Sequence, residues 1–142
     1  MNKRGQLHIS FGMIFSVIMI IIFISFAFFA ISKFLGIQRN IQINQFYDDL
    51  QNDINAVWNS PQSNQEKAYT VPSSIEKICF VNSDNNMIVY NEKGRPTGSS
   101  HIDNIDTPAI VSSGNSCFEN LDGKINLVLR KEFDDTLVTI EK

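Results

Sequence analysis

Residues that usually build catalytic and metal sites are scarce in this sequence. Its 142 residues include two histidines, two cysteines and one tryptophan, and only 19% of them are charged. The sequence contains no glycine-rich phosphate-binding loop, no nucleophile elbow and no Asn-x-Ser/Thr sequon. We therefore expect a non-enzymatic protein that holds no cofactor and no metal ion.

Charge is missing altogether from one long segment. No charged residue occurs between Arg4 and Lys33, and seven of the 11 phenylalanines lie at or before residue 34. The net charge is +2 over residues 1–32, −1 over residues 33–65 and −4 over the rest. The acidic remainder has no basic stripe, so we expect no nucleic-acid partner.

The uncharged run Phe11–Ile31 also lacks proline. At about 1.5 Å per residue, a helix of this length covers the roughly 30 Å hydrocarbon core of a bilayer. Only a helix satisfies its own backbone hydrogen bonds there, so we expect a single membrane-spanning helix. Three kinds of segment share this composition: a cleaved secretory signal, a permanent signal-anchor and a prepilin-type signal. The run is too long for the apolar core of the first kind.

Basic residues flank the apolar run on both sides, with Lys3 and Arg4 before it and Lys33 and Arg39 after it. The preference that the positive-inside rule gives is therefore small. Because only a short flank precedes the run and a cysteine-bearing domain follows it, we expect the N-in/C-out orientation.

The helical pattern continues beyond the apolar run. Apolar residues mostly recur at three- and four-residue spacing, which is typical of a helix with one apolar stripe. Asn59-Ser60-Pro61 ends the pattern, because proline disfavours helix at the residue before it. We predict one helix to about Trp58, with this stripe: Phe34, Ile37, Ile41, Ile43, Phe46, Tyr47, Leu50, Ile54, Val57 and Trp58.

After Pro61 the sequence changes to short strand-like runs separated by turn residues. Turn signals at Ser83–Asn86, Asp122-Gly123 and Phe133–Asp135 predict three hairpins, and residues 94–107 read as a loop. We expect one antiparallel sheet of five to seven short strands that packs on the outer half of the helix. The complete prediction is an α+β fold in which a long N-terminal helix packs on a small antiparallel β-sheet head.

Cys79 and Cys117 are the only cysteines. In an exported domain an even pair indicates a disulfide, and free buried cysteines are the alternative. A metal site is disfavoured because no second ligand stands at suitable spacing near either cysteine. His101, with Asp103 and Asp106, reads as part of a solvated loop. Asp84-Asn85-Asn86 lacks the glycine and the terminal glutamate that a calcium loop needs.

The start of the sequence resembles the precursors of archaeal type IV pilins and pilin-like proteins. The matching residues are Lys3-Arg4-Gly5-Gln6, followed by Leu7–Phe11 and the apolar run. In that family a prepilin peptidase cuts after the glycine of a short basic leader, and the apolar helix stays attached. The resemblance implies cleavage between Gly5 and Gln6, with Lys3 and Arg4 held on the cytoplasmic side.

Polar residues stand at the third and fifth positions after the implied cleavage, here His8 and Ser10, as is common in archaeal sequences of this family. Many members carry glutamate where this chain has Ser10. A serine cannot neutralise the new amino terminus of a neighbouring subunit, so the chain fits a minor pilin-like component or a lineage that assembles without this glutamate.

Four ranges follow from these arguments: a basic leader (1–5), a transmembrane and assembly helix (6–32), an amphipathic extension of it (33–59) and a β-rich extracytoplasmic head (60–142). Small residues four apart, Gly12 with Ser16 and Ser32 with Gly36, let membrane helices approach closely.

The resemblance implies a structural subunit whose partners are membrane lipid, a prepilin peptidase and copies of itself or other pilin-like subunits. Its expected location is the cell membrane, or a cell-surface filament once assembled. The alternative is an uncleaved single-pass signal-anchor protein whose extracytoplasmic head binds a partner or ligand.

Overall fold

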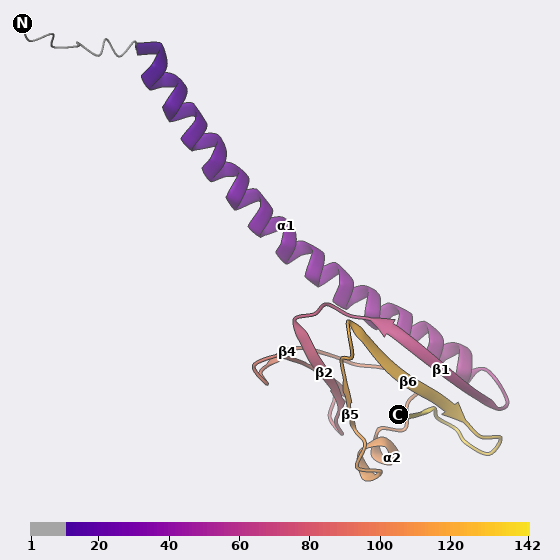
Figure 1. Cartoon of the computed structure of the whole chain (residues 1–142). Helices are drawn as coiled ribbons and strands as arrows, with labels where there is room; N and C mark the ends of the chain where they lie inside the picture. Colours follow the sequence, from indigo (N-terminus) through magenta and orange to yellow (C-terminus); the bar gives the residue numbers. More distant parts are fainter. Residues whose placement is uncertain (1–10) are drawn as a thin grey trace, which may run out of the picture. The chain divides into compact units, whose positions relative to one another are not determined.

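A computed structural model describes residues 11–142 (Figure 1). Its elements in chain order are α1 (Phe11–Trp58), β1 (Ser63–Thr70), β2 (Ile75–Phe80), β3 (Met87–Asn91), β4 (Pro96–Ser100), α2 (Thr107–Ser112), β5 (Cys117–Glu119), β6 (Lys124–Lys131) and β7 (Thr139–Glu141). The fold is α+β, with a long apolar N-terminal helix packed on antiparallel β-sheets. The chain forms two compact units, which meet in the sequence between Gln38 and Arg39. We call residues 39–142 the head unit.

Helix α1 ends at Trp58, as the sequence predicts. Within the head unit it buries one stripe, formed by Phe46, Leu50, Ile54 and Val57, with Ile43 and Tyr47 packed beside it. The stripe was expected to begin at Phe34, but Phe34, Ile37 and Ile41 are all exposed. Apolar residues recur at helical spacing both in the exposed stretch from Phe34 to Ile41 and in the buried stretch from Phe46 to Val57. The two stretches differ because the sheets pack only against the second.

The strands form two sheets rather than the one that we predicted. In the described part of the chain, one sheet has the strand order β1-β6-β7 and the other has the order β4-β3-β2-β5. All the paired strands are antiparallel. Apolar residues of both sheets join the buried stripe of α1 in one core. Figure 1 shows β1 and β6 lying beside the last part of α1.

Two of the three predicted hairpins are confirmed. Strands β2 and β3 pair across Ser83–Asn86, with Phe80 opposite Met87. Strands β6 and β7 pair across the segment that contains Phe133–Asp135, with Arg130 opposite Thr139. Both hairpins join strands that are neighbours in sequence and in the sheet.

The third predicted hairpin is wrong although its turn is present. Asp122 and Gly123 adopt positive φ values of 54° and 80°, and Leu121 and Lys124 exchange backbone hydrogen bonds across them. Beyond this contact the strands separate, because β5 pairs with β2 and β6 pairs with β1. The turn therefore connects the two sheets instead of closing a hairpin within one.

The predicted loop over residues 94–107 contains strand β4, which pairs with β3. A Cβ atom on Gly98 would lie 3.3 Å from the Tyr47 hydroxyl, so glycine suits the close approach of this strand to α1. Strand β1 likewise begins at Ser63, inside a stretch that reads as polar linker. Both are edge strands, where a polar sequence is common because one side of the strand faces solvent.

Candidate functional site: the apolar surface of α1 and its attachment to the head

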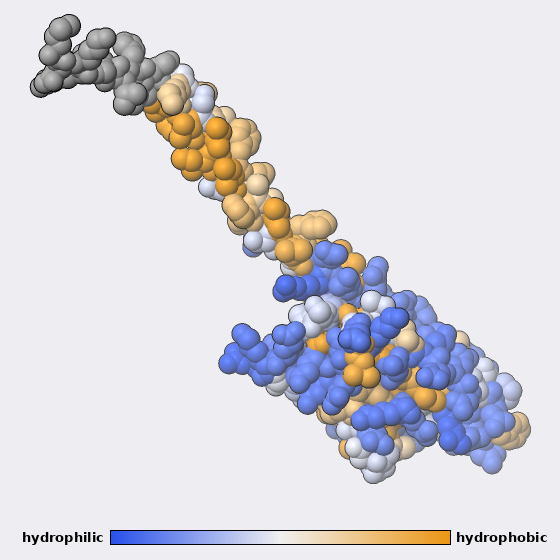
Figure 2. All heavy atoms as spheres, viewed as in Figure 1, coloured by the Kyte–Doolittle hydropathy of each residue, from blue (hydrophilic) through white to orange (hydrophobic). Residues whose placement is uncertain are grey.

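The first part of α1 presents apolar side chains on every side. Phenylalanine and isoleucine dominate it, and in its most apolar 18-residue window the mean hydropathy is 3.0 and no residue is buried. Phe15, Phe26 and Phe29 are each more than half exposed. Figure 2 shows the visible side of this part of the helix as mostly orange, with a few pale residues between. The helix is long and apolar enough to cross a membrane.

The hydroxyl groups within this apolar surface are satisfied by the helix itself. Ser16 Oγ donates to the Gly12 carbonyl at 2.7 Å, Ser25 Oγ to Ile21 at 2.8 Å and Ser32 Oγ to Phe28 at 2.9 Å. Such bonds to the carbonyl four residues earlier remove the cost of placing a hydroxyl in hydrocarbon. The serines therefore do not disturb the apolar character of the surface.

Each of the two predicted small-residue pairs lies one helical turn apart on one side of α1. Nothing lies within 4 Å of the position that a Cβ atom on Gly36 would occupy. Gly36 is thus an open place on the helix surface, and the role of both pairs in helix packing stays a prediction.

Asp53 connects the second part of α1 to strand β1. Its carboxylate accepts a hydrogen bond from Tyr69 Oη at 2.8 Å and forms an ion pair with Lys67 Nζ at 3.1 Å. Burial is the main cause that raises the pKa of the Tyr69 phenol above its usual value of 10.0, and the bond to Asp53 raises it further. The Tyr69 ring also packs edge-on against Phe46, with centroids 5.6 Å apart.

A second polar attachment joins α1 to the segment before α2. Asn55 Oδ1 accepts hydrogen bonds from Asn104 Nδ2 and from Gln51 Nε2, both at 3.0 Å. Gln51 Oε1 in turn accepts a bond from the backbone N–H of Asp103 at 2.8 Å. None of the polar residues of α1 that make these contacts was predicted from the sequence. Their helical spacing, with Gln51 and Asn55 one turn apart, is the only signal that the sequence offered.

The C-terminal end of α1 is held by β6 and the turn that follows it. Lys131 Nζ donates to the carbonyls of Trp58 and Ser60 at 2.8 and 2.9 Å, which satisfies groups that a helix end leaves unpaired. Trp58 Nε1 donates to the Thr136 carbonyl at 3.0 Å. The end of the helix is therefore fixed by the fold as well as by Pro61.

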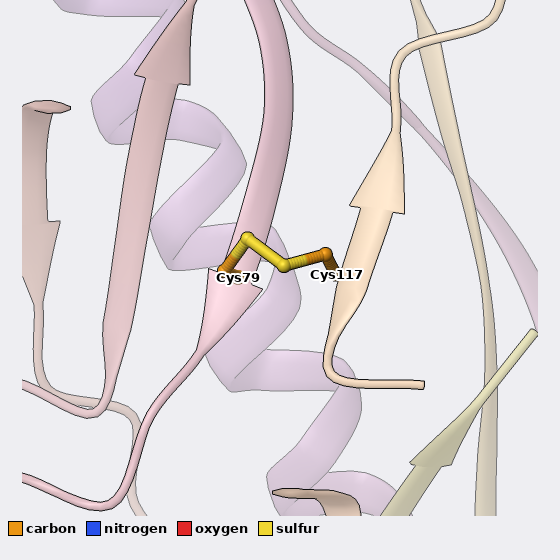
Figure 3. Close-up of a disulfide and its surroundings, with 2 residues drawn as sticks. All are labelled: Cys79 and Cys117. Carbon is orange, nitrogen blue, oxygen red and sulfur yellow. A yellow bond between two sulfur atoms is a disulfide. The ribbon is translucent and has the colours of Figure 1, made fainter. Parts of the chain in front are cut away.

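Cys79 and Cys117 form the predicted disulfide (Figure 3). The two residues are directly opposite each other on neighbouring strands β2 and β5. The bond ties the short edge strand β5 to the middle of the four-stranded sheet, and it closes a loop with a sequence separation of 38 residues.

The polar residues considered for acid–base or metal chemistry have structural contacts. His101 Nε2 lies 3.2 Å from Asp103 Oδ1 at an exposed position, and Asp106 caps α2 by accepting the Ala109 N–H at 3.0 Å. Asn86 is buried and exchanges two 2.8 Å hydrogen bonds with the backbone of Ile102. Residues 11–142 contain no group of three or more His, Cys, Asp or Glu side chains arranged to hold a metal ion.

A groove of about 440 Å³ runs between α1 and β1. Asp49, Asp53, Lys67 and Tyr69 contribute polar groups to it, and Phe46 contributes an apolar wall. Most of its charged groups are already engaged with one another through the Asp53 contacts.

Comparisons with known proteins do not extend this description. Searches of protein-family models, of curated proteins and of solved structures each gave no match to the chain. The predicted cleavage residues Gly5 and Gln6 and the basic residues Lys3 and Arg4 lie outside the described residues.

Proposed function

We propose that this protein is a non-enzymatic, type IV pilin-like subunit that is inserted N-in/C-out, cleaved after Gly5 and assembled through its apolar helix. The assembled structure would be a surface filament or the complex that initiates one. The observation that carries the proposal is the form of α1, which exposes an apolar surface on all sides before Gln38 and buries a single stripe in the head unit after it.

The physical argument concerns what such a surface can contact. Water is excluded as the solvent for so much exposed apolar area, because burying it is favoured by about 25 cal/mol per Å². Lipid chains satisfy this surface in the membrane, and apolar helices of other subunits satisfy it equally in a filament. A helix that exchanges one environment for the other gives a subunit that can leave the bilayer without unfolding its head.

The head supports this role because it is attached to α1 by several independent contacts. The buried stripe, the Asp53 contacts and the Asn55 contacts involve different strands and loops of the head unit. The helix is therefore held to the head at several places rather than at one.

Processing of the leader tests the proposal directly. The full chain is expressed together with a prepilin peptidase, and the mature product is analysed by intact mass and N-terminal sequencing. We expect the loss of residues 1–5 and a new terminus at Gln6, and we expect Gly5→Val to abolish the cleavage. An uncleaved product that is indifferent to Gly5→Val would refute the pilin-like function.

The second candidate is a permanent single-pass signal-anchor protein whose head binds a partner or ligand. The groove between α1 and β1 favours it, because that groove has a volume of about 440 Å³ and polar groups in its walls. An uncleaved chain that remains in the membrane fraction would support this candidate against the first.

A further inference from the structure

A second hollow, of about 360 Å³, lies at the edge of the head unit where α1 enters it. Three segments that are distant in sequence meet there: the first turn of α1 in the head unit, the β1–β2 connection and the β3–β4 turn. The residues that line the hollow are Arg39, Ser73, Ser74, Asn91, Glu92 and Lys93.

The two cations of this hollow, Arg39 and Lys93, form no ion pair within the described part of the chain. From Arg39 onward the chain carries nine Lys and Arg against 15 Asp and Glu, so most of the surface is acidic. Lys67 and Arg130 each pair with a carboxylate. Arg39 and Lys93, like the other five Lys and Arg of the head unit, have no carboxylate oxygen within 4.0 Å among residues 11–142, but they are the two that line one hollow. Glu92 also lines the hollow, which leaves it with a net charge of +1.

The turn that carries Lys93 is fixed by its own hydrogen bonds. Asn91 Oδ1 accepts the backbone N–H groups of Lys93 and Arg95, both at 3.0 Å, and the Asn91 N–H donates to the Arg95 carbonyl at 2.9 Å. On the other side of the hollow, the Ser73 and Ser74 hydroxyls make no hydrogen bond to any described residue. Two cations and two free hydroxyls are the donors that a phosphate group takes.

The place of Arg39 in the chain decides which phosphate can reach it. Arg39 follows Ile31 by eight residues, or about 12 Å along a helix. The polar headgroup layer extends roughly 5–7 Å beyond the hydrocarbon core, and a long arginine side chain can direct its charged end back toward that layer. With Phe11–Ile31 in the bilayer, Arg39 is therefore within reach of lipid headgroups.

We propose that this hollow binds the phosphate of an anionic phospholipid headgroup and so ties the first turn of the head unit to the membrane surface. The proposal needs only that the apolar segment spans the bilayer. It does not depend on leader cleavage or assembly, so it stands or fails separately from the pilin-like function.

The test uses the full chain in lipid nanodiscs, with hydrogen exchange of the residue 91–95 amides as the readout. We expect exchange to be several-fold slower in discs that contain phosphatidylglycerol than in pure phosphatidylcholine discs. Arg39→Gln and Lys93→Gln, separately and together, should remove this difference, and added salt should weaken it. Glu92→Gln should enlarge it, because a repulsive charge is lost from the hollow.

Lys142→Gln is the matched control, since Lys142 is a cation that lines a different hollow. It should retain the full effect of phosphatidylglycerol. Equal exchange in both kinds of disc would overturn the proposal, and so would an equal loss of protection in Lys142→Gln. A third arm adds millimolar inorganic phosphate to phosphatidylcholine discs. If free phosphate slows the exchange of the residue 91–95 amides and phosphatidylglycerol slows it no further, the lipid is rejected as the ligand.

Discussion

The two parts of α1 have the same backbone conformation and opposite surroundings. Before Gln38 the side chains are exposed all round, and Phe26 and Phe28 are 68% and 69% exposed. After Arg39 one stripe is fully buried, and Leu50, Ile54 and Val57 have no exposed surface. The comparison teaches that apolar content does not decide burial within this chain. What decides burial is whether the sheets pack against the helix. The core of the head unit covers Phe46, Leu50, Ile54 and Val57, whereas Phe34, Ile37 and Ile41 stay exposed at the same helical spacing.

Removal of the disulfide should have the largest effect and should separate the two regions. In the chain-entropy model, closing a loop of this length stabilises the head by about 4 kcal/mol. We expect the double variant Cys79→Ala/Cys117→Ala, or the wild type under reductant, to melt at a much lower temperature in detergent micelles. The apolar part of α1 should remain helical, as far-UV circular dichroism would show. An unchanged melting temperature under reductant would contradict a stabilising role for the bond.

A matched pair of isoleucine-to-alanine substitutions tests the difference in burial between the two parts of α1. Ile54→Ala removes a fully buried side chain and should cost about 3 kcal/mol of head stability. Ile22→Ala removes the same atoms from a side chain that is 55% exposed, and head stability should not change. Chemical denaturation in micelles, followed by near-UV circular dichroism, measures both. Equal losses would mean that the two parts of the helix share one packed core.

The polar attachment of α1 to β1 should contribute less. Tyr69→Phe removes the hydrogen bond to Asp53 and should cost about 1 kcal/mol, since the pair is only partly buried. Tyr90→Phe is the control, because the Tyr90 ring lies against Lys77 Nζ while its hydroxyl makes no hydrogen bond to a described residue. Denaturation midpoints of the two variants give the difference, and a cost for Tyr90→Phe as large as that for Tyr69→Phe would show that the Asp53 contact is not responsible.

The smallest effect is expected in the alkaline range. Because folding raises the pKa of Tyr69, the folded state holds this proton more tightly than the unfolded state does. The stabilisation is complete below the ordinary pKa of about 10.0 and declines as the pH rises above it. Melting temperatures measured from pH 8 to 11 should therefore fall more steeply in the wild type than in Tyr69→Phe. Parallel curves would show that Tyr69 has no part in the decline.

Much of the fold could be predicted from local patterns. The end of α1 at Trp58, the β2–β3 and β6–β7 hairpins and the cysteine pair are each specified by residues close in sequence or by a simple count. The predictions failed where a segment takes its structure from a distant partner. Strand β4 lies in a Gly-, Pro- and Ser-rich stretch and exists because β3 pairs with it. The Asp122-Gly123 turn has the sequence of a hairpin, but pairing with β2 and β1 directs its two arms into different sheets.

The candidate functional site likewise has features that the sequence alone predicts and features that depend on distant contacts. The sequence by itself determined that an uncharged segment long enough to cross a bilayer precedes an acidic remainder, because charge and length are properties of the chain alone. Only the tertiary structure decided that burial in α1 begins near Ile43, that Cys79 bonds to Cys117, that Asp53 and Asn55 attach the helix to the head, and that Arg39 and Lys93 line one hollow. These features join different elements of the fold, and no local pattern fixes which of the compatible partners a side chain meets once the chain has folded.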